Sequence, residues 1–496
     1  MTKITEGEPD FKTFEKTIFE IMCRIACELM QIYLEQRDLS IMGLRDTKEY
    51  ETVGIRETTV KTIMGEVRFR RRYYKKRAGG YVFLLDEAMG IYCGCGLASE
   101  NLAEQIVVEC TDKSFRKAAS DINSFTGQSI SAMGAWDVFQ KYGETIGEQV
   151  ARLKELDNSG STGHLGNIAS PVLFTEFDDV WVRRQCEKRR KRGENAGDTS
   201  TKPEDEGKKK LGMKPMHVGI AYTGWTQEKD GRHSTADKIA YASFGAVSDF
   251  TSAFESLLRQ RFDMDGVERR VTNGDGEEWI RNAAEESDSI LQLDPYHRGK
   301  AVIKAVSDKG DRALLFDAIG EKDVEKALTI IDILIAKTQD EKNLKKLRDL
   351  YSYFDNNRDI FLTWQERGVE LPSPPKGVTY RDMGVQESNN CSLWTQRMKH
   401  RRGSWSEKGG SHMARILSFR NTVGLVAILG ALPEPAPGKP WMEPLSAAKT
   451  PQYDGRGYGA DWLYAEMPFE NAIRTHGRKA IRNMLRMKPL SQLAFR

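Results

Sequence analysis

The stretch that most constrains this chain is PVLFTEFDDVWVRR, residues 171–184, a strand-like apolar run with acids in its middle. Branched and aromatic side chains favour a strand. A carboxylate among Leu, Phe, Val and Trp side chains is costly unless it is paired or binds a metal. Asp178 and Asp179 meet that description. The run therefore predicts a strand that brings a carboxylate to a paired or metal-binding position.

The segments that follow this run predict an α/β fold. Their order is strand, strand, helix, strand, helix, strand, helix, which together with the first strand is typical of a mixed sheet. The stretches are MHVGIAYTGW (216–225), KIAYASFGAV (238–247), a helix at 250–262, ERRVTNGDGEEWI (268–280) and SILQLDPYHRGKAV (289–302). Residues 300–370 are predicted to be helical throughout, and LPSPP ends that segment.

Two further acids stand at the ends of predicted elements. Asp275 follows a strand in TNGDGEEW, where Gly274 and Gly276 permit a tight turn. Glu387 follows the helical segment in GVQESNNC. Metal-assisted phosphoryl chemistry needs oxygen ligands that converge from separate elements. Any one of these acids could be an ordinary surface charge, but together with Asp178 they match the arrangement of a ribonuclease-H-like nuclease fold.

The stretch ILQLDPYHRGKAV places Asp294 and His297 three residues apart where a strand gives way to a helix. Asp is a good helix N-cap, and Pro295 suits the first helical position. The pair alone leaves open whether it only starts a helix or also belongs to an active site.

Two regions before residue 171 suggest contact with nucleic acid. TTVKTIMGEVRFRRRYYKKR (58–77) predicts a hairpin that turns at Met64-Gly65. Period-two alternation places Val67, Phe69 and Tyr73 on one face of its second strand, and Arg68, Arg70 and Arg72 on the other. The arginine stripe suits DNA phosphates, and an ordinary solvated face is the alternative.

Residues 114–150 predict two helices around a turn at Thr126–Gln128, with Ser114 and Ser131 as N-caps. This pattern matches a helix-turn-helix, in which the second helix enters the major groove, and it equally fits a generic helical hairpin.

An amphipathic helix is predicted over residues 10–37, where it either packs on its own domain or pairs protomers. Its apolar stripe consists of Phe11, Phe14, Ile18, Ile21, Ile25, Leu29 and Ile32.

Composition and charge exclude several classes of protein. The 496 residues allow two to four domains, and charged residues make up 30% of them. No apolar run approaches the roughly 18 residues of a membrane helix, and the N-terminus has no signal-peptide core, so a cytoplasmic protein without a membrane partner is expected. The seven cysteines are scattered, and Cys93 and Cys95 lack further ligands at zinc spacing. The charged block at 183–210 predicts a flexible loop.

With these motifs in this order, the sequence resembles bacterial insertion-sequence DDE transposases of the ISLre type, which are related to the Mutator-like group. The resemblance covers nearly the whole chain. It is carried by TIMGEVRFRRRYY, SFRKAASDI, TEFDDVWV, NGDGEEWI, LDPYHRGKA and QESNNCSLWTQRMKHRRGSWSEKGGSHMARI. It implies that Asp178, Asp275 and Glu387 are the catalytic, metal-binding triad. Asp294 and His297 would form an Asp-x-x-His signature beside it, with His297 a further catalytic residue near the metal-bound phosphate or supporting a core acid, and neither residue a metal ligand.

The resemblance also implies the reaction and its partners. Two Mg²⁺ ions, for which Mn²⁺ substitutes, would support phosphodiester hydrolysis and then strand transfer. Double-stranded DNA, as terminal inverted repeats and target, would be bound by at least a homodimer on the bacterial nucleoid. Basic residues near the triad would hold the DNA backbone, namely Arg397, Lys399, Arg401, Arg402 and Lys408. The alternatives are a catalytically inactive, transposase-derived DNA-binding protein and a ribonuclease-H-like nuclease that cuts without joining.

The expected organisation is an α/β, ribonuclease-H-like mixed-sheet catalytic core with an all-α insertion, preceded by helical, β-hairpin and helix-turn-helix DNA-binding regions. The boundaries are 1–50 for the amphipathic helix, 51–95 for the basic hairpin, 96–154 for the helix-turn-helix, 168–298 and 380–430 for the core, 299–379 for the insertion, and 431–496 for a Pro-rich linker and basic tail.

Overall fold

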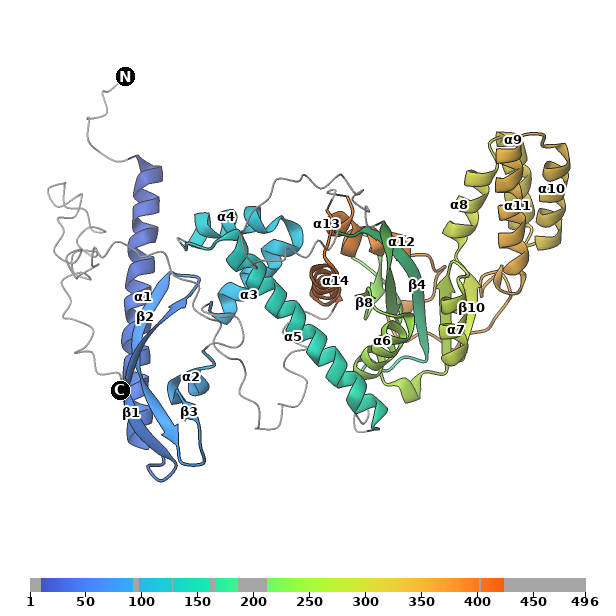
Figure 1. Ribbon diagram of the computed structural model, residues 1–496. Helices are drawn as coiled ribbons and strands as arrows, with labels where there is room; N and C mark the ends of the chain where they lie inside the picture. Colours follow the sequence, from blue (N-terminus) through green and yellow to red (C-terminus); the bar gives the residue numbers. More distant parts are fainter. Residues whose placement is uncertain are drawn as a thin grey trace, which may run out of the picture. The chain divides into compact units, whose positions relative to one another are not determined.

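The computed structural model describes residues 10–91, 98–126, 128–160, 166–185, 212–400 and 403–422 (Figure 1). Cys93 and Cys95, Arg401 and Arg402, the charged loop from Cys186 on and the C-terminal tail lie outside these residues. The chain divides into two compact units. Of the described residues, those up to Glu104 and those within Asp121–Ile130 form one unit, and those within Gln105–Ser120 and from Ser131 on form the other.

The first unit contains the predicted hairpin beside a long helix. Helix α1 (Phe11–Leu44) precedes strands β1 (Tyr50–Lys61), β2 (Glu66–Lys76) and β3 (Tyr81–Val82), which form an antiparallel sheet, and helix α2 (Leu84–Met89). Gly65 forms the hairpin turn with a positive φ of 152°. Val67 and Phe69 are buried, as predicted. Tyr73 is partly buried and stacks on Tyr81 with ring centroids 5.0 Å apart.

Helix α1 packs on the hairpin through a different stripe from the predicted one. Its contacts with the core of the unit come from Cys27, Met30, Leu34 and Ile41. Two carboxylates explain this rotation, since Glu35 accepts the backbone N–H of Arg70 at 3.0 Å and Asp38 accepts that of Arg72 at 3.0 Å. These bonds satisfy donors on the open edge of β2 and fix which side of α1 faces the sheet. None of the seven residues of the predicted stripe is among these core contacts; Phe11 and Leu29 are exposed, and the other five are partly buried.

The second unit is built on a five-stranded mixed sheet, which confirms the predicted α/β class. Its strands are β4 (Val172–Arg183), β5 (Met213–Tyr222), β8 (Ile239–Ser243), β9 (Arg269–Gly274) and β10 (Ser289–Leu293). Their order is β10-β9-β4-β5-β8. β4, β5 and β8 pair antiparallel, whereas β9 and β10 join on the other side of β4 in parallel. The strand with the first acid is therefore central.

Further elements surround this sheet. Helices α6 (Val247–Arg261) and α7 (Glu278–Glu286) and the 3₁₀ turn η1 (Met264–Gly266) connect its strands. A small antiparallel sheet has the order β11-β6-β7, with β6 (Gly224–Gln227), β7 (His233–Ala236) and β11 (Val378–Thr379). The chain then forms α12 (Gln386–Asn389), the π-helical turn η3 (Asn390–Thr395), α13 (Gln396–Met398) and α14 (Glu407–Thr422).

The two helices predicted around residues 126–128 are α4 (Phe115–Thr126) and α5 (Ala132–Asn158), and α3 (Glu100–Asp112) precedes them. The Ser114 hydroxyl accepts the N–H of Lys117 at 3.3 Å, and that of Ser131 accepts the N–H of Gly134 at 2.9 Å. Both predicted N-caps are therefore confirmed. Whether α5 reads DNA remains a prediction.

The predicted helical segment forms a bundle with a core of its own (Figure 1). It comprises α8 (Pro295–Ala305), α9 (Lys309–Gly320), α10 (Val324–Lys337), α11 (Glu341–Asn356) and the 3₁₀ turn η2 (Arg358–Ile360). The prediction that residues up to 370 are helical is wrong. Asn357 ends α11, because its side-chain amide donates to the Tyr353 carbonyl oxygen at 2.8 Å and closes the last turn. Within the described ranges, every helix is too short or too polar to cross a membrane.

Candidate metal centre

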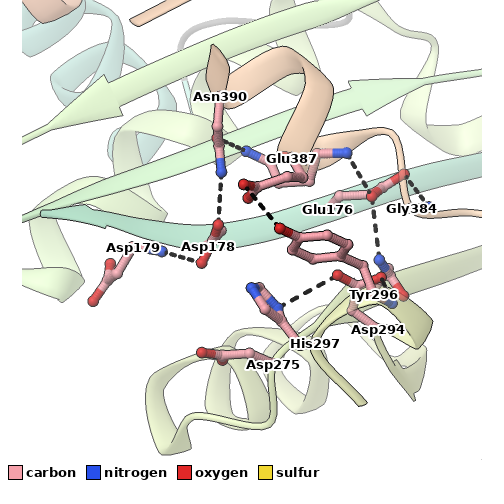
Figure 2. Close-up of polar contacts among 12 residues, drawn as sticks. Glu176, Asp178, Asp179, Asp275, Asp294, Tyr296, His297, Gly384, Glu387 and Asn390 are labelled. Carbon is pink, nitrogen blue, oxygen red and sulfur yellow. Dashed lines mark hydrogen bonds and ion pairs between the residues drawn. The ribbon is translucent and has the colours of Figure 1, made fainter. Parts of the chain in front are cut away.

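The register of two parallel strands brings the first two predicted acids together. Glu176 of β4 pairs with Asn273 of β9. Asp178 lies two residues beyond Glu176, and Asp275 two residues beyond Asn273, so both acids emerge at the same level of the sheet. Asp178, Asp275 and His297 each offer one ligand atom, and these atoms all lie within 4.8 Å of one another. Figure 2 shows these side chains facing one another.

Asp178 is buried and held from two sides. One carboxylate oxygen accepts the backbone N–H of Asp179 at 2.7 Å, and the other accepts the side-chain amide of Asn390 at 2.6 Å. Burial raises the pKa of Asp178 to about 6, while His297 opposes the shift and the negative charges of Asp275 and Glu387 add to it.

The Asp179 carboxylate lies apart from that of Asp178 (Figure 2) and has a different partner. It lies 2.7 Å from Nδ1 of His217, a residue of β5 that packs on the Trp279 ring. Of the two adjacent acids, Asp178 is the one that lies in the group with Asp275 and His297.

Asp275 lies in the turn between β9 and α7. Its carboxylate accepts the N–H of Glu277 at 3.1 Å, and its carbonyl oxygen accepts the Tyr353 hydroxyl at 3.0 Å. Gly276 has a positive φ of 89°, and a Cβ there would lie 2.1 Å from Oδ1 of Asn357. Only glycine therefore fits the turn. Burial raises the pKa of Asp275, and the Glu277 N–H opposes the shift.

The Asp-x-x-His pair opens helix α8. Asp294 is the N-cap and accepts the N–H of Tyr296 at 3.3 Å, while Pro295 is the first helical residue. Nδ1 of His297 lies 3.4 Å from a carboxylate oxygen of Asp294. The pair thus starts the helix and brings the imidazole next to the Asp294 carboxylate. The structure places His297 within the group of possible metal ligands, which corrects the expectation from the sequence that it is not a ligand.

Glu387, the third predicted acid, lies beside this group but is not a member of it. It occupies the first turn of α12, where one carboxylate oxygen accepts the Tyr296 hydroxyl at 3.4 Å. The π-helical turn that follows carries Asn390, the residue that donates to Asp178. Single π turns inside helices are frequent at functional sites.

Sequence reasoning missed two buried residues of this site. Asn390 is a long-range contact, 212 residues from Asp178 in sequence, and no local pattern indicates it. Glu176 had a signal, because it is an acid in the same apolar strand as Asp178 and the same argument applies to it. Its side chain is 0% exposed.

The predicted DNA-binding residues occupy different environments. Arg68 and Arg70 are exposed, whereas the side chain of Arg72 is only 15% exposed and pairs with Asp38. Arg397 donates to the Cys110 carbonyl oxygen at 3.0 Å and lies over the Trp405 ring. The remaining two described residues are on the surface: Lys399 is exposed, and Lys408 bonds Glu144 at 3.1 Å.

A mixed sheet whose neighbouring strands deliver one buried and one partly buried acid to an imidazole defines an α/β protein with a candidate metal centre. The sequence model of an uncharacterised protein family, UPF0236, matches residues 5–197 and 198–427, and the chain belongs to that family.

The chain is similar to curated members of the family. One is a UPF0236 protein of Caldanaerobacter subterraneus subsp. tengcongensis whose name joins eleven loci. It is 24% identical over 419 residues, which are 82% of this chain and 77% of that protein. Another is the UPF0236 protein in the vanSb 3′ region of Streptococcus gallolyticus, which is 22% identical over 426 residues and 84% of each chain.

Among solved structures, the chain is similar to the Mos1 strand transfer complex, with 10% identity over 53% of this chain and 78% of that one. The Mos1 mariner paired end complex with Mn is 12% identical over the same shares. The TM-scores are 0.11 and 0.13, which are too low to support any conclusion about this chain.

Proposed function

We propose that this chain is a DDE-type DNA transposase of the ISLre kind, which cuts and joins phosphodiester bonds with divalent metal ions. The observation that carries the proposal is the meeting of Asp178, Asp275 and His297 at the end of two parallel strands, with Glu387 beside them. The negative charges of Asp275 and Glu387 disfavour ionisation of the buried Asp178, and a bound cation would remove that cost.

The donor set fits a divalent cation. Two carboxylates supply hard oxygen ligands, which suit Mg²⁺ and Mn²⁺, and an imidazole nitrogen is also a ligand for transition metals. A cation held here would polarise a phosphoryl oxygen and lower the pKa of bound water. The set therefore fits a divalent ion of the kind implied by the resemblance, with Asp178 and Asp275 as ligands and Glu387 available from the neighbouring helix.

The surrounding residues orient these ligands. Asn390 fixes one oxygen of Asp178, Asp294 lies against the imidazole of His297, and the Tyr296 hydroxyl bonds Glu387. In metal sites, residues that hydrogen-bond to the ligands without contacting the metal fix the orientation of those ligands and tune their basicity. With its pKa at about 6, Asp178 is mostly ionised at neutral pH, as a metal ligand must be.

The strand arrangement supports a ribonuclease-H-like core. Strand β4, which carries Asp178, pairs antiparallel with β5, and β5 pairs antiparallel with β8. On the other side of β4, β9 and β10 are parallel to it, and β9 ends directly before Asp275. The third acid follows on a helix after an all-helical segment. The resemblance stated from the sequence implies this order of elements.

Repetition in a genome supports transposition. The name of one relative joins eleven loci, and many copies of one gene are typical of mobile elements. We therefore expect double-stranded DNA, as the ends of the element and its target, to be the substrate. Since two ends must be brought together, we expect at least a dimer.

The test is an incubation of the full chain with a plasmid that carries the DNA flanking its own gene, with Mg²⁺ or Mn²⁺, followed by mapping of new 3′ ends. Asp275→Asn keeps the acceptor for the Glu277 N–H but loses the charge. Glu278→Gln changes an exposed acid on the adjacent helix and serves as control. Breaks at defined positions by the wild type and the control alone, followed by joined products, support the proposal. Cutting without joining indicates a nuclease, and binding without cutting indicates an inactive derivative.

A further inference from the structure

Glu176 is a buried carboxylate that the proposed chemistry does not use. It lies two residues before Asp178 on β4, on the same face of the strand, and is 0% exposed. Its two oxygens accept five hydrogen bonds. The donors are the Tyr222 hydroxyl at 2.6 Å, the side-chain amide of Asn273 at 3.2 Å, and the backbone N–H groups of Gly384 at 3.2 Å, Val385 at 3.2 Å and Gln386 at 3.0 Å.

All five partners donate, so an ionised carboxylate fits this position and a protonated acid or an amide does not. Burial raises the pKa of Glu176, and the Tyr222 hydroxyl and the backbone N–H groups of Gly384 and Gln386 oppose that shift. Hydrogen bonds to a charged acceptor in a water-excluded site are stronger than neutral ones. Glu176 is therefore a strong attachment point.

Three of the donors belong to the segment that begins α12 (Figure 2). Val385 is the N-cap of this helix but makes no side-chain capping bond, and Glu387 lies in its first turn. Glu176 thus satisfies backbone donors that a local cap would otherwise satisfy. Because the anchored residues directly precede Glu387, the anchor sets where that acid lies relative to β4.

The attachment extends across the sheet. Oδ1 of Asn273 accepts the side-chain amide of Gln292 at 3.0 Å, and Oε1 of Gln292 accepts the backbone N–H of Trp364 at 3.0 Å. Glu176, Asn273 and Gln292 occupy paired positions on β4, β9 and β10, and none is more than 1% exposed. Together these three side chains bond both ends of residues 364–386, the segment that returns from the helical bundle to α12: Gln292 accepts from Trp364, and Glu176 accepts from Gln386.

We propose that Glu176 is a positioning residue that fixes the start of α12, and through it Glu387, onto the strand that carries Asp178. The attachment itself is independent of the proposed function, whereas its effect on DNA cleavage rests on that function.

The first test is hydrogen exchange in the full chain, measured on the peptide that covers residues 383–390. Glu176→Gln places an NH₂ group among five donors, so we expect exchange of the Val385 and Gln386 amides to rise on the order of tenfold or more. Thr175→Val is the matched control. Thr175 is the next residue of β4, faces the other way, is equally buried and bonds the Thr272 hydroxyl at 2.7 Å. Thr175→Val should leave the hydrogen exchange of this peptide unchanged.

A second variant guards against failure to fold. Tyr222→Phe removes one donor and keeps the ring, so exchange of the same peptide should rise in the same direction by a smaller factor. If exchange is unchanged in both variants, or rises equally in Thr175→Val, Glu176 does not hold α12 and the proposal is overturned.

The second test is the rate of DNA cleavage under single turnover. Glu176→Gln should slow cleavage of bound DNA and raise the Mg²⁺ concentration needed for half-maximal rate, while the affinity for DNA stays unchanged. Thr175→Val should change none of these. Faster exchange with an unaltered cleavage rate would overturn the positioning role. If the wild type itself does not cleave, the proposed function fails, and the exchange result alone then supports or overturns the attachment.

Discussion

Replacing Asp178 with Asn should stabilise the metal-free protein at neutral pH. The pKa of Asp178 is about 6 in the folded chain, against an ordinary value of 3.8. Since the folded state binds the proton more tightly, the free energy of unfolding falls as pH rises from about 4 to about 6 and stays lowered above that range. A shift of this size corresponds to about 3 kcal/mol at pH 7.5, because each unit is worth about 1.4 kcal/mol.

The same substitution also loses a hydrogen bond. Asp178 accepts from both the Asp179 N–H and the Asn390 amide, and Asn offers only one oxygen. Leaving one donor unsatisfied costs about 1 kcal/mol. The expected net effect is a gain of about 2 kcal/mol at pH 7.5 and a loss of about 0.5 kcal/mol at pH 4, where the aspartate is protonated in the folded state and only partly protonated in the unfolded state.

Thermal unfolding in the presence of EDTA, followed by circular dichroism, measures how the stability difference between Asp178→Asn and the wild type changes sign with pH. At pH 7.5 the melting temperature of Asp178→Asn should exceed that of the wild type by roughly 4 °C. Adding Mg²⁺ or Mn²⁺ should raise the melting temperature of the wild type but not that of Asp178→Asn, so the difference between the two should become smaller. Asp249→Asn, at an exposed acid, should change little at either pH. Equal differences at the two pH values would refute the electrostatic argument.

Three other predictions concern helix packing, acid stability and DNA contact. Gly143→Ala on α5 should lower the free energy of unfolding by about 1–3 kcal/mol in a urea titration, since the new Cβ would lie 2.4 Å from Cβ of His412. Gly147→Ala is the control and should be tolerated, because its Cβ would meet only the flexible end of an arginine side chain. Burial lowers the pKa of His412 to about 4, so stability should fall as pH drops from 6.5 towards 4, and His412→Asn should flatten that fall. Arg68→Ala and Arg70→Ala should each weaken DNA binding at all sequences and reduce the slope of log affinity against log salt by about one.

The order of elements could be predicted from the sequence because its signals are local. Period-two runs gave the hairpin and the sheet strands, and serines at helix starts predicted the caps of α4 and α5. The orientation of α1 could not be predicted, since it depends on bonds between Asp38 and a strand 34 residues away.

The site was predictable only in part for the same reason. Strand alternation requires Asp178 and Asp179 to face opposite ways but does not say which faces the site. Their partners decide it, Asn390 for the first and His217 for the second, and both contacts are distant in sequence. Glu176 carries the same signal as Asp178, an acid in an apolar strand, but its role could not be predicted, because three of its five donors are backbone N–H groups distant in sequence.

Metal binding tests the central claim most directly, since it requires no knowledge of the DNA ends. Calorimetric titration of the full chain with Mn²⁺ at pH 7.5 should show binding by the wild type that is lost or strongly weakened in Asp178→Asn and in Asp275→Asn. Unchanged Mn²⁺ affinity in both variants would show that these two acids do not form a metal centre, and the proposed chemistry would lose its basis.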